Sequence, residues 1–484
     1  MNSFYYLSFV AVVYPIFHLT PQRWRWLLLL AASYVFYGFL KAPYLLAVLV
    51  MVTGISYACG LRIAAQQDEI IRRRWLRIGS FSCGFILVLL KCLPFLDLHG
   101  RSIPGLQSTF FPYVISIGVS YFTFQAISYL ADIYFEVEEP EHHFGRYALY
   151  LAFFPKLLQG PIERAGQLIP QLKAGYQFCY DNMRRCLVLF ALGLFKKVVV
   201  ADRIALYADT VYSDVHSYTG LALLLGTYAY ALQIYFDFSG YTDMARATGR
   251  MFGINLTENF NTPYLATSIA DFWRRWHISF SRWILDYLFK PLQFGWRDWG
   301  QAGTAAALIV TFLISGLWHG VSWGFLCWGG LHGSYLALAL YWRPYQRRLH
   351  KWLGIEGSAF LKCWQVFATF HMVSLAWVFF RANSLADARY VIGNALNLSG
   401  CYHRLAALGL REFVARDVML LMPRHRFVAD LMILGALYLL YRGRNIDFYA
   451  RPAWFRWSAY YALLVAIMFL GAFNSSSKFI YIQF

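Results

Sequence analysis

The sequence predicts an all-α integral membrane protein, and two observations carry that prediction. The chain has 484 residues, of which 59% are hydrophobic and 14% charged, and its mean hydropathy is +0.45. Soluble domains are about 45–50% apolar and about 25% charged, so this composition excludes an ordinary soluble enzyme. Continuous apolar runs of about 20 residues also recur along the chain, as transmembrane helices require. They lack the alternating pattern of a membrane β-barrel, which we reject.

The apolar runs give the expected order of helices. No basic residue precedes Arg23, so the run from Phe4 to Leu19 is expected to be a first membrane helix and not a cleavable signal peptide. Some runs are short or interrupted, which leaves the helix count uncertain by two or three. The expected spans are 4–20, 25–41, 43–61, 76–93, 110–131, 184–201, 219–236, 303–317, 320–341, 359–380, 427–441 and 455–473.

The basic residues indicate topology. The formal net charge is +18, but Lys and Arg lie mostly in short segments between apolar runs, which argues against a nucleic-acid partner. Arg62 and the cluster from Arg72 to Arg77 mark the cytoplasmic side. Counting helices from that cluster places both termini outside. One conflict remains, because the basic residues at 424–426 and 442–444 are separated by a single apparent helix.

His319 is the strongest single candidate for a functional residue. It lies in an otherwise uncharged apolar run, Thr311–Trp323. An ionisable side chain at membrane depth is costly and is a functional hypothesis by default. The glycines at 316 and 320 are expected to leave room for a substrate beside the imidazole. The alternative is a core histidine satisfied by a backbone carbonyl.

Residues 145–340 differ from the plain apolar ends, because polar and charged residues are threaded through aromatic sequence. We expect this region to hold the catalytic core. Within it, two prolines and a glycine interrupt the run 153–164. Irregular backbone at membrane depth is tolerated only where it is buried or lines a cavity. The run therefore predicts a re-entrant segment, with Arg164 as a structural polar residue of the cavity.

Two carboxylates, Asp237 and Asp243, bracket Gly240 in an aromatic stretch. They are six positions apart, or about 240° around a helix, and do not share a face unless the helix breaks at the glycine. This spacing argues against a paired-carboxylate acid/base device. We expect both to anchor neighbouring polar groups or an arginine.

The run Asp271–Ser281 combines arginines, tryptophans and a second candidate histidine, His277. Guanidinium groups suit phosphate recognition and stack on aromatic faces. Trp273, Arg274 and Arg275 are therefore candidates for binding a phosphate-bearing donor. Interfacial anchoring explains Trp273 and Arg274 equally well, but it does not explain His277.

No metal site is expected. His332 follows His319 by thirteen positions, so on one continuous helix it would point to nearly the opposite side. Neither His319 nor His277 has neighbours at metal-ligand spacing. The eight cysteines show no such spacing either and are expected to be free thiols.

Taken together, these runs resemble the membrane-bound O-acyltransferase (MBOAT) family. The resemblance is to the branch of the alginate O-acetylation protein AlgI, whose relatives modify cellulose, peptidoglycan and other envelope polymers. It spans most of the chain. Its most specific pieces are 154–164, 235–244, Asn259-Phe260 with Pro263-Tyr264, 272–279 and 316–320.

The resemblance implies a single polytopic domain over 1–484, with a ring of about 11–14 transmembrane and re-entrant helices around a central funnel. It implies His319 as the catalytic histidine and His277 as the second important position. The donor would be cytoplasmic acetyl-CoA, with no permanently bound cofactor. A periplasmic SGNH-type acetyltransferase would complete the transfer to a polysaccharide within an exopolysaccharide biosynthesis complex. The location would be a bacterial inner membrane, with both termini periplasmic.

The last residues, 474–484, resemble an outward-facing tail motif of the same group. Tyr481 matches a tyrosine proposed there as a covalent acyl carrier between the membrane protein and its periplasmic partner. A simple interfacial aromatic anchor is the alternative.

These features predict acyl transfer from a thioester to a hydroxyl. His319, as a neutral imidazole, would accept the hydroxyl proton, a contribution of about 10²–10⁴-fold. His277 would orient the acceptor, donate to the oxyanion or hold His319, and the sequence leaves these roles open. The alternatives are a transporter or polymer conduit in which His319 relays protons, and an MBOAT that acylates a lipid or a protein.

Overall fold

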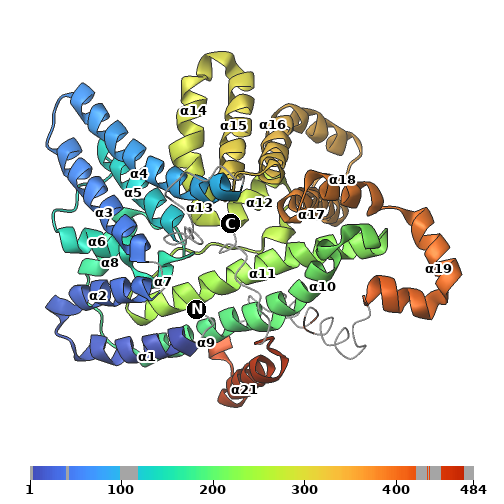
Figure 1. Ribbon diagram of the computed structural model, residues 1–484, viewed down its shortest axis with the longest axis horizontal. Coiled ribbons are helices and arrows are strands. Elements are labelled where there is room, and N and C mark those ends of the chain that lie inside the picture. Colours follow the sequence, from blue (N-terminus) through green and yellow to red (C-terminus); the bar gives the residue numbers. More distant parts are fainter. Residues whose placement is uncertain are drawn as a thin grey trace. The chain divides into compact units, whose positions relative to one another are not determined.

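The structure is a computed structural model that describes residues 4–39, 43–98, 118–420, 433, 435 and 448–473 (Figure 1). Throughout these residues the regular elements are helices, and none is a strand. The all-α prediction is therefore confirmed. In this described part, six helices are long and apolar enough to cross a membrane, at Tyr44–Ala64, Glu69–Cys92, Leu221–Met251, Arg297–His319, Ala359–Arg381 and Ala453–Leu470.

The chain forms two compact units. Unit 1 comprises Met1–Phe190, Thr242–Asn261 and His277–Leu292, and unit 2 comprises Ala191–Tyr241, Thr262–Trp276 and Gln293–Phe484. Each unit therefore combines segments that are far apart in the sequence.

The helices before residue 200 include several long apolar helices and three short, largely buried ones, α6 to α8. They are α1 (Phe4–Leu19), α2 (Arg25–Gly38), α3 (Pro43–Ala64), α4 (Glu69–Leu98), α5 (Val119–Tyr134), α6 (Phe144–Ala152), α7 (Phe154–Leu157), α8 (Ala165–Lys173) and α9 (Tyr180–Phe195). In unit 1, α3, α4 and α5 pack on one another, and α6 packs against α2, α3 and α8.

The remaining helices alternate between short elements and long apolar ones. They are α10 (Asp202–Ser213), α11 (Leu221–Met251), α12 (Ile269–Arg275), α13 (Ile278–Ile284), α14 (Lys290–Gly295), α15 (Gly300–His319), α16 (Trp323–Trp352), α17 (Ala359–Arg381), α18 (Leu385–Asn394), α19 (Leu398–Phe413) and α21 (Ala453–Leu470). In unit 2, α15 packs against α16, and α16 packs against α17 (Figure 1).

Small residues allow α15 and α16 to pack closely as an antiparallel pair. A Cβ atom on Gly329 would lie 2.2 Å from the Phe312 carbonyl oxygen, and one on Gly316 would lie 2.3 Å from the Phe325 carbonyl oxygen. Neither contact is sterically possible, so both positions require glycine for this packing. Small residues serve the same purpose in other membrane helix pairs, where they let backbones approach closely.

Most of the expected spans match helices, with two informative differences. Helix α4 starts at Glu69, before the arginine cluster, and α11 continues unbroken through Gly240 to Met251. The expected span 427–441, the start of the span 110–131 and the conflicting basic residues 424–426 and 442–444 lie outside the described residues. The ring of helices around a funnel stays a prediction.

The interrupted run 153–164 is irregular, as the sequence predicts. Helix α7 is four residues long, the chain from 158 to 164 is non-helical, and every side chain from Phe153 to Glu163 is buried. Its position as a re-entrant segment in the membrane stays a prediction.

Candidate active site

His319 is the last residue of α15, and the chain reverses direction immediately after it. Gly320 ends the helix, and Ser322 starts α16 by accepting a hydrogen bond from the Phe325 backbone N–H at 3.3 Å. This three-residue turn places His319 against the first turns of α16. Its side chain is buried in unit 2, with 4% exposure.

Aromatic rings surround His319. Its imidazole centroid lies 5.0 Å from the Trp328 ring, 4.9 Å from Phe380, 6.1 Å from Phe325 and 4.5 Å from Trp318. Three helices, α15, α16 and α17, supply these rings. Such packing excludes bulk water and fixes the orientation of the ring.

The glycines beside His319 are used differently from the sequence expectation. A Cβ atom on Gly320 would lie 2.7 Å from the Phe325 ring, and the space beside Gly316 is filled by the Phe325 backbone. The expectation that these glycines leave room for a substrate is therefore wrong. Gly316 lets the backbones of α15 and α16 approach closely, and Gly320 leaves space that the Phe325 ring occupies.

A second histidine, His332, lies in the same aromatic cluster of unit 2. Trp328 is in contact with both histidines, at ring-centroid distances of 5.0 Å to His319 and 5.1 Å to His332. The prediction that His332 points away from His319 assumed one continuous helix. That assumption is wrong, because the turn at Gly320–Ser322 separates the two residues onto α15 and α16.

The tautomer of His332 follows from its hydrogen bond. The Trp273 indole N–H donates to His332 Nδ1 at 3.2 Å. Since Nδ1 accepts, the ring proton resides on Nε2. In the described part of the chain, Nε2 has no hydrogen-bond partner. Trp273 thus positions a buried imidazole N–H, a role that sequence reasoning did not find.

Further buried polar atoms of this cluster also lack partners among the described residues. Buried polar groups are normally hydrogen-bonded, and leaving one unpaired costs about 1–3 kcal/mol. Unpaired atoms of this kind are available for hydrogen bonds with a polar ligand. Besides His332 Nε2, they are Thr311 Oγ1, Ser315 Oγ, Trp328 Nε1 and Trp377 Nε1.

These atoms lie on a small number of helix faces. Thr311, Ser315 and His319 recur every fourth residue of α15 and so lie on one face of that helix. Trp377 on α17 stacks on Trp328, with centroids 5.9 Å apart and planes 23° apart. The two indole N–H groups are the kind of donor that binds a carbonyl oxygen or a developing oxyanion.

His277 is buried in unit 1 in a strained conformation. It precedes α13 with φ of 42° and ψ of 55°, in the left-handed region. A non-glycine residue there costs about 1–3 kcal/mol and often marks a functional site. The ring packs on Phe280 at 5.1 Å and on Tyr121 at 6.4 Å. Burial lowers the pKa of His277 to about 3, so the ring is neutral.

Asn259 holds the backbone around His277 in place. Its carbonyl oxygen accepts from the Ile278 N–H at 3.0 Å, and its side-chain oxygen accepts from the Ser279 N–H at 3.1 Å. The Ser279 hydroxyl oxygen in turn accepts from the Ile162 N–H at 3.0 Å. Two of the sequence motifs, around Asn259 and in the irregular run, therefore support the strained turn at His277.

The irregular run also contains two buried ionisable residues that sequence reasoning did not single out. The Lys156 ammonium donates to the Gln125 side-chain oxygen. The Glu163 carboxylate accepts from the Thr257 N–H at 2.6 Å and from its hydroxyl at 2.9 Å. Gln125 and Thr257 are distant in sequence from the run. The only sequence signal for Lys156 and Glu163 was the presence of two charged residues in an apolar stretch.

The arginine of that run has partners in unit 1, and its role in a cavity stays a prediction. Arg164 forms an ion pair with Asp286 at 3.1 Å and stacks over the Tyr287 ring at 4.1 Å. The Tyr287 hydroxyl donates to Asp132 at 2.5 Å. The residues therefore tie the run to α5 and to the segment after α13.

Asp237 and Asp243 each form an ion pair with a cation. Asp237 pairs with Lys197 at 2.5 Å in unit 2, where both side chains are buried and Lys197 also pairs with Asp202 at 2.8 Å. Asp243 pairs with Arg246 at 3.5 Å in unit 1. Because α11 is continuous, the two carboxylates do not share a helix face.

Arg274 and Arg275 are paired with the carboxylate of their own helix. The distances to Asp271 are 3.6 Å and 3.0 Å, and the Arg274 side chain is 74% exposed. Burial raises the pKa of Asp271, but the hydrogen bond from Arg275 and the charge of Arg274 hold it below its usual value overall. Their binding of donor phosphates stays a prediction, as does the carrier role of Tyr481, which lies outside the described residues.

The described residues form no cluster of metal-binding side chains. Across residues 4–39, 43–98, 118–420 and 448–473, no three His, Cys, Asp or Glu side chains converge on a metal position. The chemistry available in the unit 2 cluster is proton transfer by an imidazole and hydrogen bonding by indole and imidazole N–H groups.

A buried histidine among unpaired N–H donors in a helical membrane protein fits a group-transfer enzyme. The family described as "MBOAT, membrane-bound O-acyltransferase family" matches residues 135–379. This range contains His277, His319 and His332. The chain belongs to this family, and it is a membrane-bound O-acyltransferase.

Relatives are similar over most of the chain. A Helicobacter pylori protein named peptidoglycan O-acetyltransferase is 33% identical, over 98% of this chain and 94% of its own. A Pseudomonas aeruginosa protein named probable alginate O-acetylase AlgI is 35% identical, over 87% of this chain and 83% of its own. An Azotobacter vinelandii protein of the same name is 37% identical, over 79% and 75%.

Proposed function

We propose that this protein transfers an acetyl group from cytoplasmic acetyl-CoA across a bacterial inner membrane, for O-acetylation of an exported polysaccharide of the alginate or cellulose type. The observation that carries the proposal is the burial of His319 in the unit 2 cluster, within the range that matches the family. The names of the relatives support acetyl as the acyl group and an envelope polymer as the final acceptor.

His319 acts as the general base in this proposal. Its imidazole takes the proton of the acceptor hydroxyl while the hydroxyl oxygen attacks the thioester carbonyl carbon. A tetrahedral intermediate forms and then expels the CoA sulfur, so that a C–O bond replaces the C–S bond. The imidazolium returns its proton to the leaving thiolate, and His319 is neutral again.

The unpaired N–H groups of the cluster suit the oxyanion of that intermediate. Trp328 Nε1, Trp377 Nε1 and His332 Nε2 are buried donors without partners among the described residues. Donors fixed in place before the reaction stabilise developing charge without reorganisation, and removing one from such a site typically costs about 10²–10³-fold in kcat. Trp273 acts through His332, as a positioning residue.

His277 supports the reaction from its own strained turn. Its neutral ring either orients the acceptor, donates to the oxyanion or holds His319. Arg274 and Arg275 contribute to binding the donor phosphates, since guanidinium groups suit them.

A periplasmic SGNH-type acetyltransferase completes the transfer to the polysaccharide. Both termini face the periplasm, and the tail 474–484 presents Tyr481 as the residue that carries the acetyl group to that partner. The family membership and the arrangement of polar groups around His319 support this enzyme over a transporter or polymer conduit.

Donor dependence tests the proposal. The purified protein in liposomes should transfer or hydrolyse the acetyl label of radiolabelled acetyl-CoA. If no label leaves acetyl-CoA, the proposal is wrong. In cells, a deletion strain should lose acetyl groups from an envelope polysaccharide. Tyr481→Phe should abolish polymer acetylation while the protein still reacts with acetyl-CoA in liposomes. Normal polymer acetylation in that variant would contradict the carrier role of Tyr481, whereas a deletion strain whose polysaccharide keeps its acetyl groups would point to a lipid or protein acceptor.

A further inference from the structure

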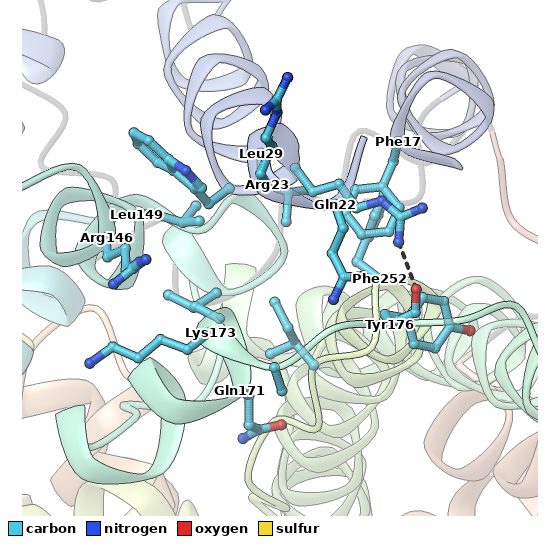
Figure 2. A pocket seen from close by; sticks show the side chains of 15 residues that line it. Phe17, Gln22, Arg23, Leu29, Arg146, Leu149, Gln171, Lys173, Tyr176 and Phe252 are labelled. Atoms are coloured by element: carbon cyan, nitrogen blue, oxygen red, sulfur yellow. Dashed lines mark hydrogen bonds between the residues drawn. The ribbon is translucent and has the colours of Figure 1, made fainter. Parts of the chain in front are cut away.

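Unit 1 contains a cavity of about 360 Å³ that the proposed acetyl transfer does not use (Figure 2). It lies where α1 turns into α2, and α6, α8 and the chain after α8 and α11 complete its wall. Its lining combines four cations, Arg23, Arg25, Arg146 and Lys173, with aromatic and aliphatic side chains. Such a lining suits a ligand with an anionic and an apolar part.

The positive charge of the cavity is only partly compensated, because the Glu141 carboxylate is close to Lys173 and Arg146 but Arg23 and Arg25 have no such partner among the described residues. No Asp or Glu is among the fifteen side chains that line it. Lys173 pairs with Glu141 at 2.7 Å, outside the lining. Within the described residues, Arg23, Arg25 and Arg146 have no ion-pair partner closer than 4.0 Å. Three cations facing one cavity repel one another, and an anionic ligand relieves that repulsion.

Arg25 is fixed in the wall before any ligand arrives. Its guanidinium donates to the Tyr176 carbonyl oxygen at 2.6 Å, shown as the dashed line in Figure 2, and to the Thr20 carbonyl oxygen at 3.1 Å. It also stacks over the Phe17 ring at 4.8 Å. These neutral partners hold the group without neutralising it. A preorganised guanidinium loses little freedom when it binds a phosphate.

The cavity lies at the end of the apolar helices. Helix α1 ends at Leu19 and α2 begins at Arg25, so the cavity lies where two apolar helices meet a basic turn. Trp26 lies in its wall and packs edge-on against His143, with centroids 4.7 Å apart. Tryptophan and arginine together are typical of headgroup depth.

The cavity is also at the arginine-rich end of unit 1. The segment 136–141 connects the arginine cluster to the cavity. Glu136 pairs with Arg72 of the cluster at 2.6 Å, and Glu141 pairs with Lys173 of the cavity at 2.7 Å. Arg72 belongs to the cluster that marks the cytoplasmic side. Anionic lipids give that leaflet its negative surface potential, and basic residues there bind them.

We propose that this cavity binds the phosphate of an anionic phospholipid headgroup in the cytoplasmic leaflet. Arg25 and Arg146 supply positive charge that attracts the phosphate, and the aliphatic and aromatic part of the lining, including Leu29 and Leu149, packs against the glycerol and the first acyl carbons. The bound lipid ties α1, α2, α6 and α8 together. This site is separate from the His319 cluster, and the proposal stands whether or not acetyl is the transferred group.

The test uses the full-length protein in neutral detergent, with bound lipid counted by native mass spectrometry. Wild type should bind phosphatidylglycerol at least about tenfold more tightly than phosphatidylcholine, since a basic residue near anionic lipid is worth about a factor of five. Equal affinities would overturn the proposal. Inorganic phosphate and CoA are added as competitors, and displacement of phosphatidylglycerol by either at equal concentration would instead assign the cavity to a soluble phosphate.

Variants locate the binding site. Arg146→Gln should weaken phosphatidylglycerol binding about fivefold, and Arg25→Gln with Arg146→Gln about 30-fold. The matched control is Arg347→Gln with Arg348→Gln, which removes the same charge from the exposed end of α16. An equal loss in the control pair would show that general surface charge and not the cavity binds the lipid. The wild-type comparison decides the question if the double variant fails to fold.

Discussion

The indole N–H of Trp273 donates to Nδ1 of His332, at 3.2 Å, across two helices of unit 2. This bond leaves the His332 proton on Nε2, beside the Trp328 ring that also contacts His319. Phe272 stacks on the other side of the cluster, with its ring 6.2 Å from His332 and planes 10° apart. The aromatic pair in the middle of α12, Phe272 and Trp273, therefore builds the surroundings of a histidine on α16.

The Trp273–His332 bond should show as an energetic coupling. Trp273→Phe leaves Nδ1 buried without a donor, which is expected to destabilise the protein by about 1–3 kcal/mol. In a His332→Phe background the same change should cost much less, because no acceptor remains. Thermal melting of the four proteins in detergent gives the coupling. Strictly additive losses would contradict a stabilising bond.

The α15–α16 contact should be sensitive to one added methyl group at a defined position. Gly329→Ala places a Cβ atom 2.2 Å from the Phe312 carbonyl oxygen, so the helices must separate. Overpacking of this kind typically costs about 1–3 kcal/mol, and acyl transfer should fall because His319 ends α15. Gly330→Ala is the matched control, since its Cβ atom would meet only the Leu313 side chain at 3.7 Å. Equal melting temperatures for the two variants would disprove the close contact.

Lys197 should be among the most sensitive charged residues of unit 2. It pairs with Asp237 and Asp202, and all three side chains are buried. Lys197→Met leaves two carboxylates without their cation, a loss of about 3–5 kcal/mol for a broken buried pair. Arg416→Met breaks the exposed pair with Glu412 and should cost about 0–1 kcal/mol. Expression and melting temperature report the difference, and similar values for both variants would count against the buried triad.

Because His277 is buried as a neutral ring, the free energy of unfolding should fall as the pH is lowered. Burial lowers its pKa to about 3 in the folded protein, whereas an unfolded histidine titrates near 6.5. Below pH 6.5 the unfolded chain therefore takes up a proton that the folded protein excludes. The group's contribution is complete above pH 6.5 and is lost as the pH falls toward 3, by up to about 1.4 kcal/mol per pH unit. His277→Asn should melt with a shallower dependence on pH between 6.5 and 4. An unchanged slope would mean that His277 is not buried as a neutral ring.

Hydropathy and local pattern predicted the helices well where each run could be judged alone. The long apolar spans, the irregular backbone at 153–164 and the separate anchoring roles of Asp237 and Asp243 all follow from composition, proline and glycine placement, and helix geometry. These properties are local, and one sequence is enough to estimate them.

The cluster around His319 was only half predicted, because its other members arrive by tertiary packing. His332 was assigned to the wrong side since one helix was assumed where Gly320 and Ser322 make a turn. A serine three residues before the Phe325 N–H was the available signal for a new helix start. The contacts of Trp273 with His332, and of Lys156 with Gln125, join residues far apart in the chain, and no periodicity reveals them.

Acyl transfer by His319→Asn protein is the most direct test of the central claim. Equal amounts of folded wild type, His319→Asn and His371→Asn are placed in liposomes with radiolabelled acetyl-CoA. His371 lies in the apolar helix α17, and its Nε2 is hydrogen-bonded to the Tyr228 hydroxyl at 2.7 Å. It serves as the matched control. If His319 is the general base, His319→Asn should lose about 10²–10⁴-fold of the turnover, and His371→Asn should keep near wild-type turnover. Wild-type turnover by folded His319→Asn protein would contradict that role.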